Sequence, residues 1–322
     1  MSALLEVEGL RVGFPVGGRM VEVVRGVSFS VREGEALGLV GESGSGKSQT
    51  ALAVLRLLKA PGRILGGSVR FAGEELTRLD ERGMARLRGA GISIVFQDAM
   101  AALNPAFTIG TQLTDVIMAH GGGGGGGSRR RARDGAVAAL ERVGIVDAGR
   151  RLGAYPHQFS GGMRQRVVIA MAVACGPRLL VADEPTTALD VTVQKQIVRL
   201  LASLRAEMGL GLLFITHNLD LMAEICDRAV VLYGGMVMEE APVAALFAAP
   251  RQPYTRALLA CVPRLSDAAG VFGMIEGAPP VAGRLGAGCP FEPRCGERLA
   301  VCAGERPVER TLEGARVACW AA

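Results

Sequence analysis

The segment Gly41-Glu42-Ser43-Gly44-Ser45-Gly46-Lys47-Ser48 constrains this chain more than any other feature, because it fits the pattern G-x-x-x-x-G-K-[ST]. It lies between an apolar run at residues 36–40, which predicts a buried strand, and residues 49–58, which predict a helix. A strand, a glycine-rich loop and a helix in this order are the setting of a phosphate-binding loop. An ordinary glycine turn would need neither Lys47 nor Ser48. The segment therefore predicts an α/β fold that binds a nucleotide.

The residue types in this loop suit the chemistry of a polyphosphate. Glycines let backbone N–H groups turn toward phosphate oxygens, and the start of the helix adds its positive dipole end. Lys47 can bridge the outer phosphates, and the Ser48 hydroxyl can bind Mg²⁺. We therefore expect all eight residues to contact ATP: Gly41, Glu42, Ser43, Gly44, Ser45, Gly46, Lys47 and Ser48.

A second motif follows the apolar run Leu179-Leu180-Val181-Ala182, which predicts another buried strand. This strand ends in Asp183-Glu184. Ligand sites in open α/β sheets lie at the carboxyl ends of the strands. Asp183 would hold Mg²⁺, and Glu184 would orient and polarise the attacking water.

Two further polar residues each follow a strand-like run. Gln97 comes after residues 92–96, and its amide can reach the metal or the water. His217 comes after residues 212–216, and its imidazole can bind a γ-phosphate. Alone, His217 would be an ordinary strand-end histidine. Alongside the other motifs, we expect Glu184, His217, Gln97 and Lys47 to be the catalytic residues.

A fifth motif, Ser160-Gly161-Gly162-Met163, precedes a helical run at residues 167–175 and would form a second anion site at a helix start. The order of the five motifs resembles that of an ATP-binding cassette. The resemblance implies that Ser160, Gly161, Gly162 and Met163 contact the γ-phosphate bound by an opposite subunit. It also implies that Ala188-Leu189-Asp190 communicates across the pair. Phe14 could stack on adenine, although an apolar core position is equally compatible with it.

Three longer stretches, at residues 155–159, 186–194 and 253–259, resemble the ATPases of oligopeptide/dipeptide (nickel/peptide) ABC importers. Met163, together with residues 186–190, is similar to the D-type subunit of that group. The resemblance implies an ATPase that energises uptake of di-/oligopeptides. Its expected partners are an F-type ATPase in a heterodimer, two transmembrane permease subunits and an extracytoplasmic peptide-binding protein. An importer of another small solute such as nickel, or a soluble ABC ATPase without a transport role, remains an alternative.

The resemblance also predicts the domain organisation, and the 322 residues with 49% apolar content suit one cassette plus an appendage. The ATP-binding domain would span residues 1–253 and contain a helical subdomain at about 98–175. That subdomain, with helical spacing at 113–119 and 135–143, would contact the permease. Residues 254–322 would form a small Cys-rich extension. Strands are expected at residues 4–14, 23–31, 68–71 and 229–232 and around Ile92, Leu179 and Leu212.

Seven consecutive glycines at residues 121–127 precede Ser128 and the cluster Arg129-Arg130-Arg131. Because glycine loses the most backbone entropy on ordering, this stretch predicts a flexible surface tether without regular structure. The arginines could serve as a lipid or partner patch. We favour a low-complexity loop that the surface tolerates.

Four of the seven cysteines, Cys289, Cys295, Cys302 and Cys319, lie in the tail. In a reducing cytoplasm disulfides are disfavoured, and four thiolates can hold zinc or an iron-sulfur cluster. The spacings lack paired C-x-x-C knuckles, and residues 289–295 and 317–319 resemble the extension of the importer ATPases. This resemblance implies a 4Fe-4S cluster, with zinc and then free thiols as the alternatives. Cys175, Cys226 and Cys261 lie in apolar surroundings and are expected to be packing residues.

Charge and hydropathy suggest where the protein acts. The formal net charge of +5 is small and, apart from the arginine cluster, scattered, so nucleic-acid binding is not expected. No apolar run approaches the roughly eighteen residues of a membrane span. The first six residues lack the features of a signal peptide. We therefore expect a peripheral protein on the cytoplasmic face of the inner membrane.

Overall fold

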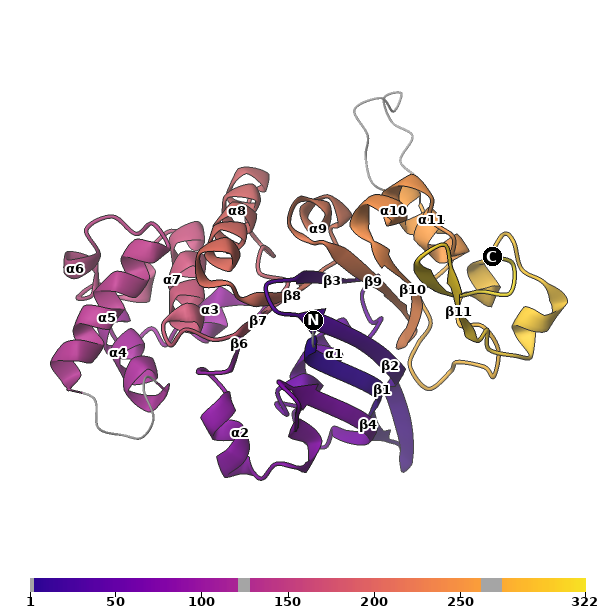
Figure 1. Ribbon diagram of the computed structural model, residues 1–322, viewed down its shortest axis with the longest axis horizontal. Coiled ribbons are helices and arrows are strands. Elements are labelled where there is room, and N and C mark those ends of the chain that lie inside the picture. The colour runs from indigo at the N-terminus through magenta and orange to yellow at the C-terminus, as the bar shows by residue number, and fades with distance from the viewer. Residues whose placement is uncertain (1–2, 121–127, 262–273) are drawn as a thin grey trace. The chain divides into compact units, whose positions relative to one another are not determined.

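The computed structural model describes residues 3–120, 128–261 and 274–322, and these form two compact units (Figure 1). The first unit comprises residues 1–31, 36–77 and 215–322, and the second comprises residues 32–35 and 78–214. The second unit is thus largely a single insertion in the sequence of the first. The boundary between them falls inside one strand, β8 (Gly211–Thr216).

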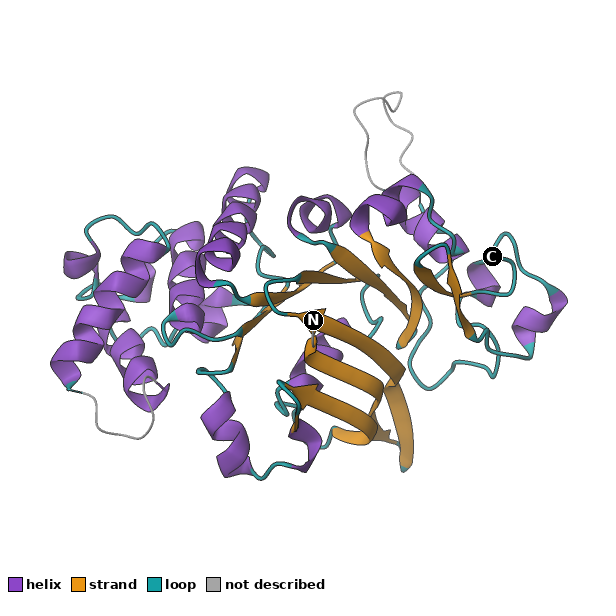
Figure 2. Ribbon diagram, in the orientation of Figure 1, coloured by secondary structure: helices purple, strands orange, loops and turns teal. Residues whose placement is uncertain are grey.

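The first unit combines two sheets with short helices (Figure 2). One sheet has the strand order β2-β1-β4-β5, and the other contains the run β11-β12-β10-β9-β3. The strands are β1 (Ala3–Val16), β2 (Arg19–Arg32), β3 (Ala36–Val40), β4 (Arg63–Phe71), β5 (Glu74–Glu75), β9 (Arg228–Tyr233), β10 (Met236–Pro242), β11 (Glu309–Leu312) and β12 (Ala315–Ala318). The helices are α1 (Lys47–Val54), α9 (Leu219–Ile225), α10 (Val243–Ala248) and α11 (Pro253–Ala260).

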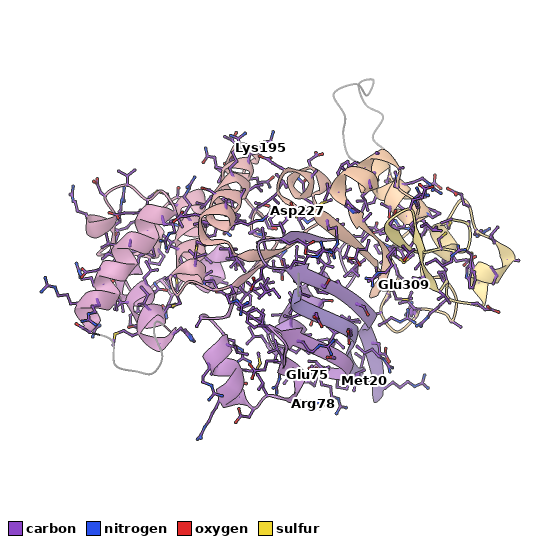
Figure 3. The ribbon with its side chains drawn as sticks, in the orientation of Figure 1. Met20, Glu75, Arg78, Lys195, Asp227 and Glu309 are labelled. Atoms are coloured by element: carbon purple, nitrogen blue, oxygen red, sulfur yellow. The ribbon has the colours of Figure 1, made fainter. Side chains whose placement is uncertain are left out.

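Strand β3 lies at the centre of the core because all five of its residues are buried. It pairs in parallel with β9, with Leu37 opposite Arg228 and Val40 opposite Val231. A near-continuous apolar run is typical of a parallel strand covered on both faces. At the start of β3, the backbone N–H of Ala36 donates to Asp227 (Figure 3) at 2.9 Å. The strand that carries the phosphate loop is therefore fixed at its start as well as along its length.

The other sheet pairs β1 with β4 in antiparallel register, with Leu5 opposite Phe71. Glu75 (Figure 3) lies in β5, at the edge of this sheet. Its carboxylate accepts hydrogen bonds from the hydroxyls of Ser68 and Thr77 and from the backbone N–H groups of Val69 and Thr77. Burial opposes the charge of Glu75, but these donors outweigh burial and lower its pKa to about 2. Glu75 is therefore an ionised anchor of the β4–β5 turn.

The C-terminal extension adds two strands to the same sheet as β3. β12 pairs with β10, with Glu239 opposite Val317, and β11 pairs with β12. Tyr233 at the end of β9, Tyr254 in α11 and Phe291 form an aromatic cluster, with ring centroids 4.5 to 5.3 Å apart. The extension therefore shares a sheet and an apolar core with the strand that carries the phosphate loop.

The second unit contains strands of the run β8-β7-β6 and a group of helices. Its elements are α2 (Glu81–Leu87), β6 (Ile92–Val95), α3 (Ala99–Ala102), α4 (Ile109–His120), α5 (Arg129–Arg142), α6 (Ala148–Arg151), α7 (Gly161–Val173), β7 (Leu179–Asp183), α8 (Val191–Met208) and the greater part of β8. Helices α4, α5, α6 and α7 lie together (Figure 1), and Leu113, Ala136, Leu140 and Val167 are among their buried residues. These helices lie within residues 98–175, where the helical subdomain is predicted, and the bounds of that subdomain stay a prediction.

Most predicted elements are present, with shifted ends. The predicted helix at 49–58 ends earlier, at Val54, because Leu55 caps it and Arg56 adopts a left-handed φ of 51°. Helix α5 begins at Arg129, earlier than the helical spacing predicted at 135–143, so the arginine cluster that follows the glycine run forms its first turn. Arginine is a good helix former, so the entropy argument applies to glycine alone. The expectation for residues 121–127 falls outside the described residues.

Within the described ranges, none of the helices is both long and apolar enough to cross a membrane.

Candidate nucleotide-binding site

The predicted site residues divide between the two units. Phe14, the loop at residues 41–48 and His217 belong to the first unit, whereas Gln97, residues 160–163 and the Asp183-Glu184 pair belong to the second. We describe each group within its own unit.

The phosphate loop has the backbone conformation that its glycines allow. Gly41, Gly44 and Gly46 have φ values of 149°, 79° and 100°, which favour residues without a Cβ. A Cβ on Gly41 would lie 2.2 Å from the carbonyl oxygen of Leu232, and one on Gly46 would lie 2.9 Å from that of Val23. The loop therefore depends on glycine both for its turn and for its close approach to neighbouring strands.

Lys47 is folded back into this loop. Its Nζ donates to the carbonyl oxygens of Gly41 at 2.8 Å and Glu42 at 2.9 Å, and it lies 3.4 Å from the Ser45 hydroxyl. Lys47 is also the first residue of α1, and Gly46 is its N-cap. The ammonium group and the start of a helix are thus placed on one short loop, as a phosphate site requires.

Glu42 of the loop is held by two residues that follow it far along the chain, Tyr254 and Arg294. Its backbone N–H donates to the Tyr254 hydroxyl at 2.8 Å. Its carboxylate accepts from both terminal nitrogens of Arg294, at 2.7 and 3.1 Å, and Arg294 also donates to the Tyr233 hydroxyl at 3.0 Å. Burial opposes the charge of Arg294, but these hydrogen bonds outweigh it and raise its pKa.

In the second unit, Gln97 and Glu184 are hydrogen-bonded to each other. β6 and β7 pair in parallel, with Val95 opposite Ala182, so the residues that follow them reach the same edge of the sheet. Gln97 Nε2 donates to Glu184 Oε2 at 2.9 Å, and the Thr187 hydroxyl donates to the same oxygen at 3.0 Å. Glu184 adopts a left-handed φ of 46°. Such strain in a residue other than glycine is typical of functional sites.

Asp183 is the last residue of β7 and is buried. A buried carboxylate directly before Glu184 has the chemistry that Mg²⁺ prefers, since this hard cation binds oxygen ligands. Of the other two predicted magnesium ligands, Ser48 is the second residue of α1, and Gln97 lies two positions after the end of β6. The residue types present therefore fit a magnesium-dependent nucleotide site.

The fifth motif, Ser160-Gly161-Gly162-Met163, lies at the start of α7. The Ser160 hydroxyl caps this helix by accepting from the Met163 backbone N–H at 3.3 Å. A Cβ on Gly162 would lie 2.7 Å from Val193 of α8, so glycine is needed for the two helices to approach. Ser160 and Gly161 are exposed at the start of this thirteen-residue helix, and the anion site there stays a prediction.

His217 and Phe14 have different surroundings. His217 follows β8 directly and is exposed, and Asn218 after it caps α9. Phe14 is half-buried near the end of β1, and a Cβ on Gly62 would lie 2.4 Å from its ring. Phe14 therefore packs on the glycine, which leaves its proposed contact with adenine a prediction.

The four tail cysteines interact with one another. Burial raises the pKa of Cys289 to about 11, and the proximity of Cys302, Cys319 and Cys295 raises it further. Backbone N–H groups point at two of the sulfurs, from Leu299 to Cys302 at 3.4 Å and from Ala321 to Cys319 at 3.3 Å. All four are free thiols. Nevertheless, among the residues that the structure describes, no three His, Cys, Asp or Glu side chains are arranged to hold a metal ion.

The expectation of packing roles holds most clearly for Cys226, which is buried in the core, whereas Cys175 and Cys261 are half-buried.

Sequence reasoning missed the Glu42 contacts. Tyr254 and Arg294 both lie in stretches that the resemblance singled out, at residues 253–259 and 289–295, but nothing local in those stretches connects them to the phosphate loop.

A glycine-dependent phosphate loop on a buried parallel strand, with an amide and a carboxylate meeting at the end of two other parallel strands, defines an ATP-binding cassette. Comparison with solved structures agrees. A dimeric ATP-binding cassette, MJ0796, bound to ADP and Pi has a TM-score of 0.65 and 28% identity, covering 74% of this chain and 98% of that one. CbiO1 from Clostridium perfringens, part of the ABC transporter complex cbiONQ, has a TM-score of 0.65 and 25% identity, covering 77% of this chain and 92% of that one.

Family models match the ABC transporter at residues 24–187 and the oligopeptide/dipeptide transporter C-terminal region at residues 238–302. The oligopeptide transport ATP-binding protein OppD of Escherichia coli (strain K12) is 47% identical over 319 residues, which cover 99% of this chain and 93% of the relative. Its namesake from Salmonella typhimurium (strain LT2) is also 47% identical and is covered to 94%. The chain belongs to the oligopeptide/dipeptide branch of the ABC transporter ATPases.

Proposed function

We propose that this chain is the ATP-binding and ATP-hydrolysing subunit of an importer that energises uptake of di-/oligopeptides. The near full-length similarity to two oligopeptide transport ATP-binding proteins supports this substrate class. The match of residues 238–302 to the transporter C-terminal region points the same way. Neither alternative, nickel import or a soluble ATPase without a transport role, gains support from these relatives.

The observation that carries the catalytic part is the hydrogen bond between Gln97 and Glu184. In this proposal Glu184 orients the attacking water, and Gln97 positions Glu184 and reports the nucleotide state. Lys47 binds the outer phosphates, His217 contacts the γ-phosphate, and Phe14 stacks on adenine. Ser48, Gln97 and Asp183 would hold Mg²⁺, which neutralises phosphate charge when bound. Ser160, Gly161, Gly162 and Met163 would face the ATP of a partner.

The proposed assembly has the chain as the D-type member of a heterodimer with an F-type ATPase. Two transmembrane permease subunits and an extracytoplasmic peptide-binding protein complete it. The helices α4 to α7 would contact the permease, and the chain would lie as a peripheral subunit on the cytoplasmic face of the membrane. The ATP-binding domain would span residues 1–253 and the extension 254–322.

Purified transporter in liposomes tests this proposal. Peptide-loaded binding protein should stimulate phosphate release and peptide uptake together, and Glu184→Gln in this chain should abolish the uptake. Stimulation by a nickel-loaded binding protein but not by a peptide-loaded one would reject the substrate class. ATP hydrolysis by a chain that does not assemble with the permease would instead favour a soluble ATPase.

We also propose that Cys289, Cys295, Cys302 and Cys319 hold a 4Fe-4S cluster. The backbone N–H groups directed at the sulfurs of Cys302 and Cys319 support a thiolate-bound group. When bound, such a group would cross-link the separate turns of the extension. Zinc is the alternative.

Anaerobic purification with iron, sulfide and zinc analysis tests the cluster. About four iron atoms per chain are expected, with visible absorbance that the Cys289→Ser, Cys295→Ser double variant loses. Cys261→Ser is the matched control, since its sulfur contacts only the Ala257 carbonyl of its own helix among the contacts the structure gives. Zinc alone, or no metal at all, would reject the iron-sulfur cluster.

A further inference from the structure

The phosphate loop carries a carboxylate at Glu42, which is unfavourable beside a polyphosphate because like charges repel. In this protein the carboxylate is paired with Arg294, in the extension, 252 residues further along the chain. The Arg294 side chain is only 5% exposed, and that of Glu42 is 22% exposed. The pair is therefore largely shielded from solvent. Charges interact more strongly in such a position than at an open surface.

Hydrogen bonds from every nitrogen of its guanidinium group hold Arg294 in this position. Its Nη1 donates to Glu42 and Tyr233, its Nη2 to Glu42 and the Ile275 carbonyl, and its Nε to the Glu276 carbonyl at 2.8 Å. A guanidinium has five N–H donors, and all five have an acceptor here. The planar fork also matches the carboxylate in a bidentate way that lysine cannot reproduce.

The same loop residue is held through its main chain. The buried Tyr254 accepts from the Glu42 N–H, and Lys47 donates to the Glu42 carbonyl. Thus Glu42 connects three groups: a guanidinium and a phenol from the extension, and the ammonium expected to bind phosphate. Hydrogen bonds through Glu42 therefore connect the extension to Lys47.

We propose that Arg294 is a positioning residue for ATP binding. It neutralises the Glu42 carboxylate and fixes the phosphate loop, so the cysteine-containing extension is a working part of the nucleotide site. The inference rests on the proposed role of residues 41–48 in binding ATP. It assigns to the extension a function that does not depend on which metal its cysteines hold.

A single variant and a compensating double variant test the proposal. In the full chain assembled with its transporter, Arg294→Ala leaves a shielded carboxylate without its cation and should weaken ATP binding about tenfold. Glu42→Gln alone leaves Arg294 without its anion and is measured as the reference for the double variant. Adding Glu42→Gln to Arg294→Ala should recover most of the lost affinity. Binding is measured by titration with a fluorescent ATP analogue.

Kinetics and controls separate positioning from misfolding. Arg294→Ala should raise the KM for ATP about tenfold while kcat changes less than about twofold, because Arg294 does not touch the reacting atoms. Arg294→Lys should recover part of the affinity. Arg298→Ala is the matched control, because its side chain is 61% exposed and lies 3.8 Å from Glu292. Thermal unfolding and metal content report whether the extension stays folded.

Three results would overturn the inference. A folded Arg294→Ala variant with wild-type ATP affinity would show that the pair does not act on the nucleotide. Equal losses in Arg294→Ala and Glu42→Gln, without recovery in the double variant, would show that the pair only holds the fold together. A wild-type chain that fails to bind ATP would overturn the proposed function itself, and this inference with it.

Discussion

Gln97 Nε2 lies 2.9 Å from Glu184 Oε2, although 87 residues separate the two in sequence. The parallel pairing of β6 with β7 brings them to one sheet edge, and Thr187 holds the same carboxylate oxygen. The left-handed backbone of Glu184 aims the side chain from a position that is costly to maintain. This arrangement is the basis for the first prediction.

Glu184→Gln should lower the rate of ATP hydrolysis at least about a hundredfold, because the amide keeps the contacts with Gln97 and Thr187 but cannot polarise water as a carboxylate does. ATP affinity should stay within about threefold of the wild type, since the phosphate loop is unchanged. Phosphate release and ATP titration check the two expectations. Hydrolysis at the wild-type rate would remove Glu184 from the catalytic residues.

Gly162→Ala should destabilise the protein by about 1 to 3 kcal/mol. The added methyl group would lie 2.7 Å from Val193 Cγ1. Adding Val193→Ala should recover most of the loss, because it removes the obstructing group. Gly161→Ala is the control, since its Cβ would lie 3.6 Å from Leu189 and clash with nothing. Thermal unfolding measures all four proteins, and a double variant no more stable than Gly162→Ala would contradict the packing argument.

Tyr254→Phe should lower the free energy of unfolding by about 1 to 2 kcal/mol, because the Glu42 N–H then loses its acceptor while the ring still fills its place. Burial, the largest influence on Tyr254, raises its pKa, so the phenol stays neutral at physiological pH. Tyr155→Phe, at a residue that is 40% exposed, should have no effect. Denaturant unfolding compares the variants, and equal stability of all three proteins would argue against the bond to Glu42.

Glu75 makes a pH-dependent contribution to stability. Its folded pKa of about 2 is below its ordinary value of 4.5, so the ionised form favours folding. This contribution is fully present above about pH 4.5 and is lost as the pH falls toward 2. The unfolding midpoints of the wild type and Glu75→Gln should therefore differ most near neutrality and converge in acid. Glu74→Gln, at an exposed neighbouring residue, is the control. A difference that stays constant from pH 7 to pH 3 would contradict the argument.

The local parts of the fold could be predicted from the sequence. The apolar run at β3, the glycine loop and α1 follow one another directly, so their pattern predicts them together. The same holds for β7 with Asp183 and Glu184. The start of α5 at Arg129 was not predicted, because the sequence indicates helical spacing only from residue 135 and the arginines at 129–131 directly follow a glycine run.

Contacts between remote segments left no local pattern. The pairing of β12 with β10 joins Glu239 with Val317, which are 78 positions apart, and the ion pair of Arg294 with Glu42 joins residues 252 positions apart. An arginine between two cysteines is typical of a solvent-exposed turn. Only the fold shows that this arginine lies in a shielded position with a carboxylate as its partner.

The parallel pairing of β3 with β9 has a consequence for the order of synthesis. Residues 37–40 find their neighbours at residues 228–231, so nearly two hundred residues are translated before that partner strand exists. At the usual rate of about 5 to 20 residues per second, the wait is on the order of ten to forty seconds. During that time a nascent chain displays a nucleotide loop on an unpaired apolar strand. A ribosome-associated chaperone that covers this strand would have a long interval in which to act.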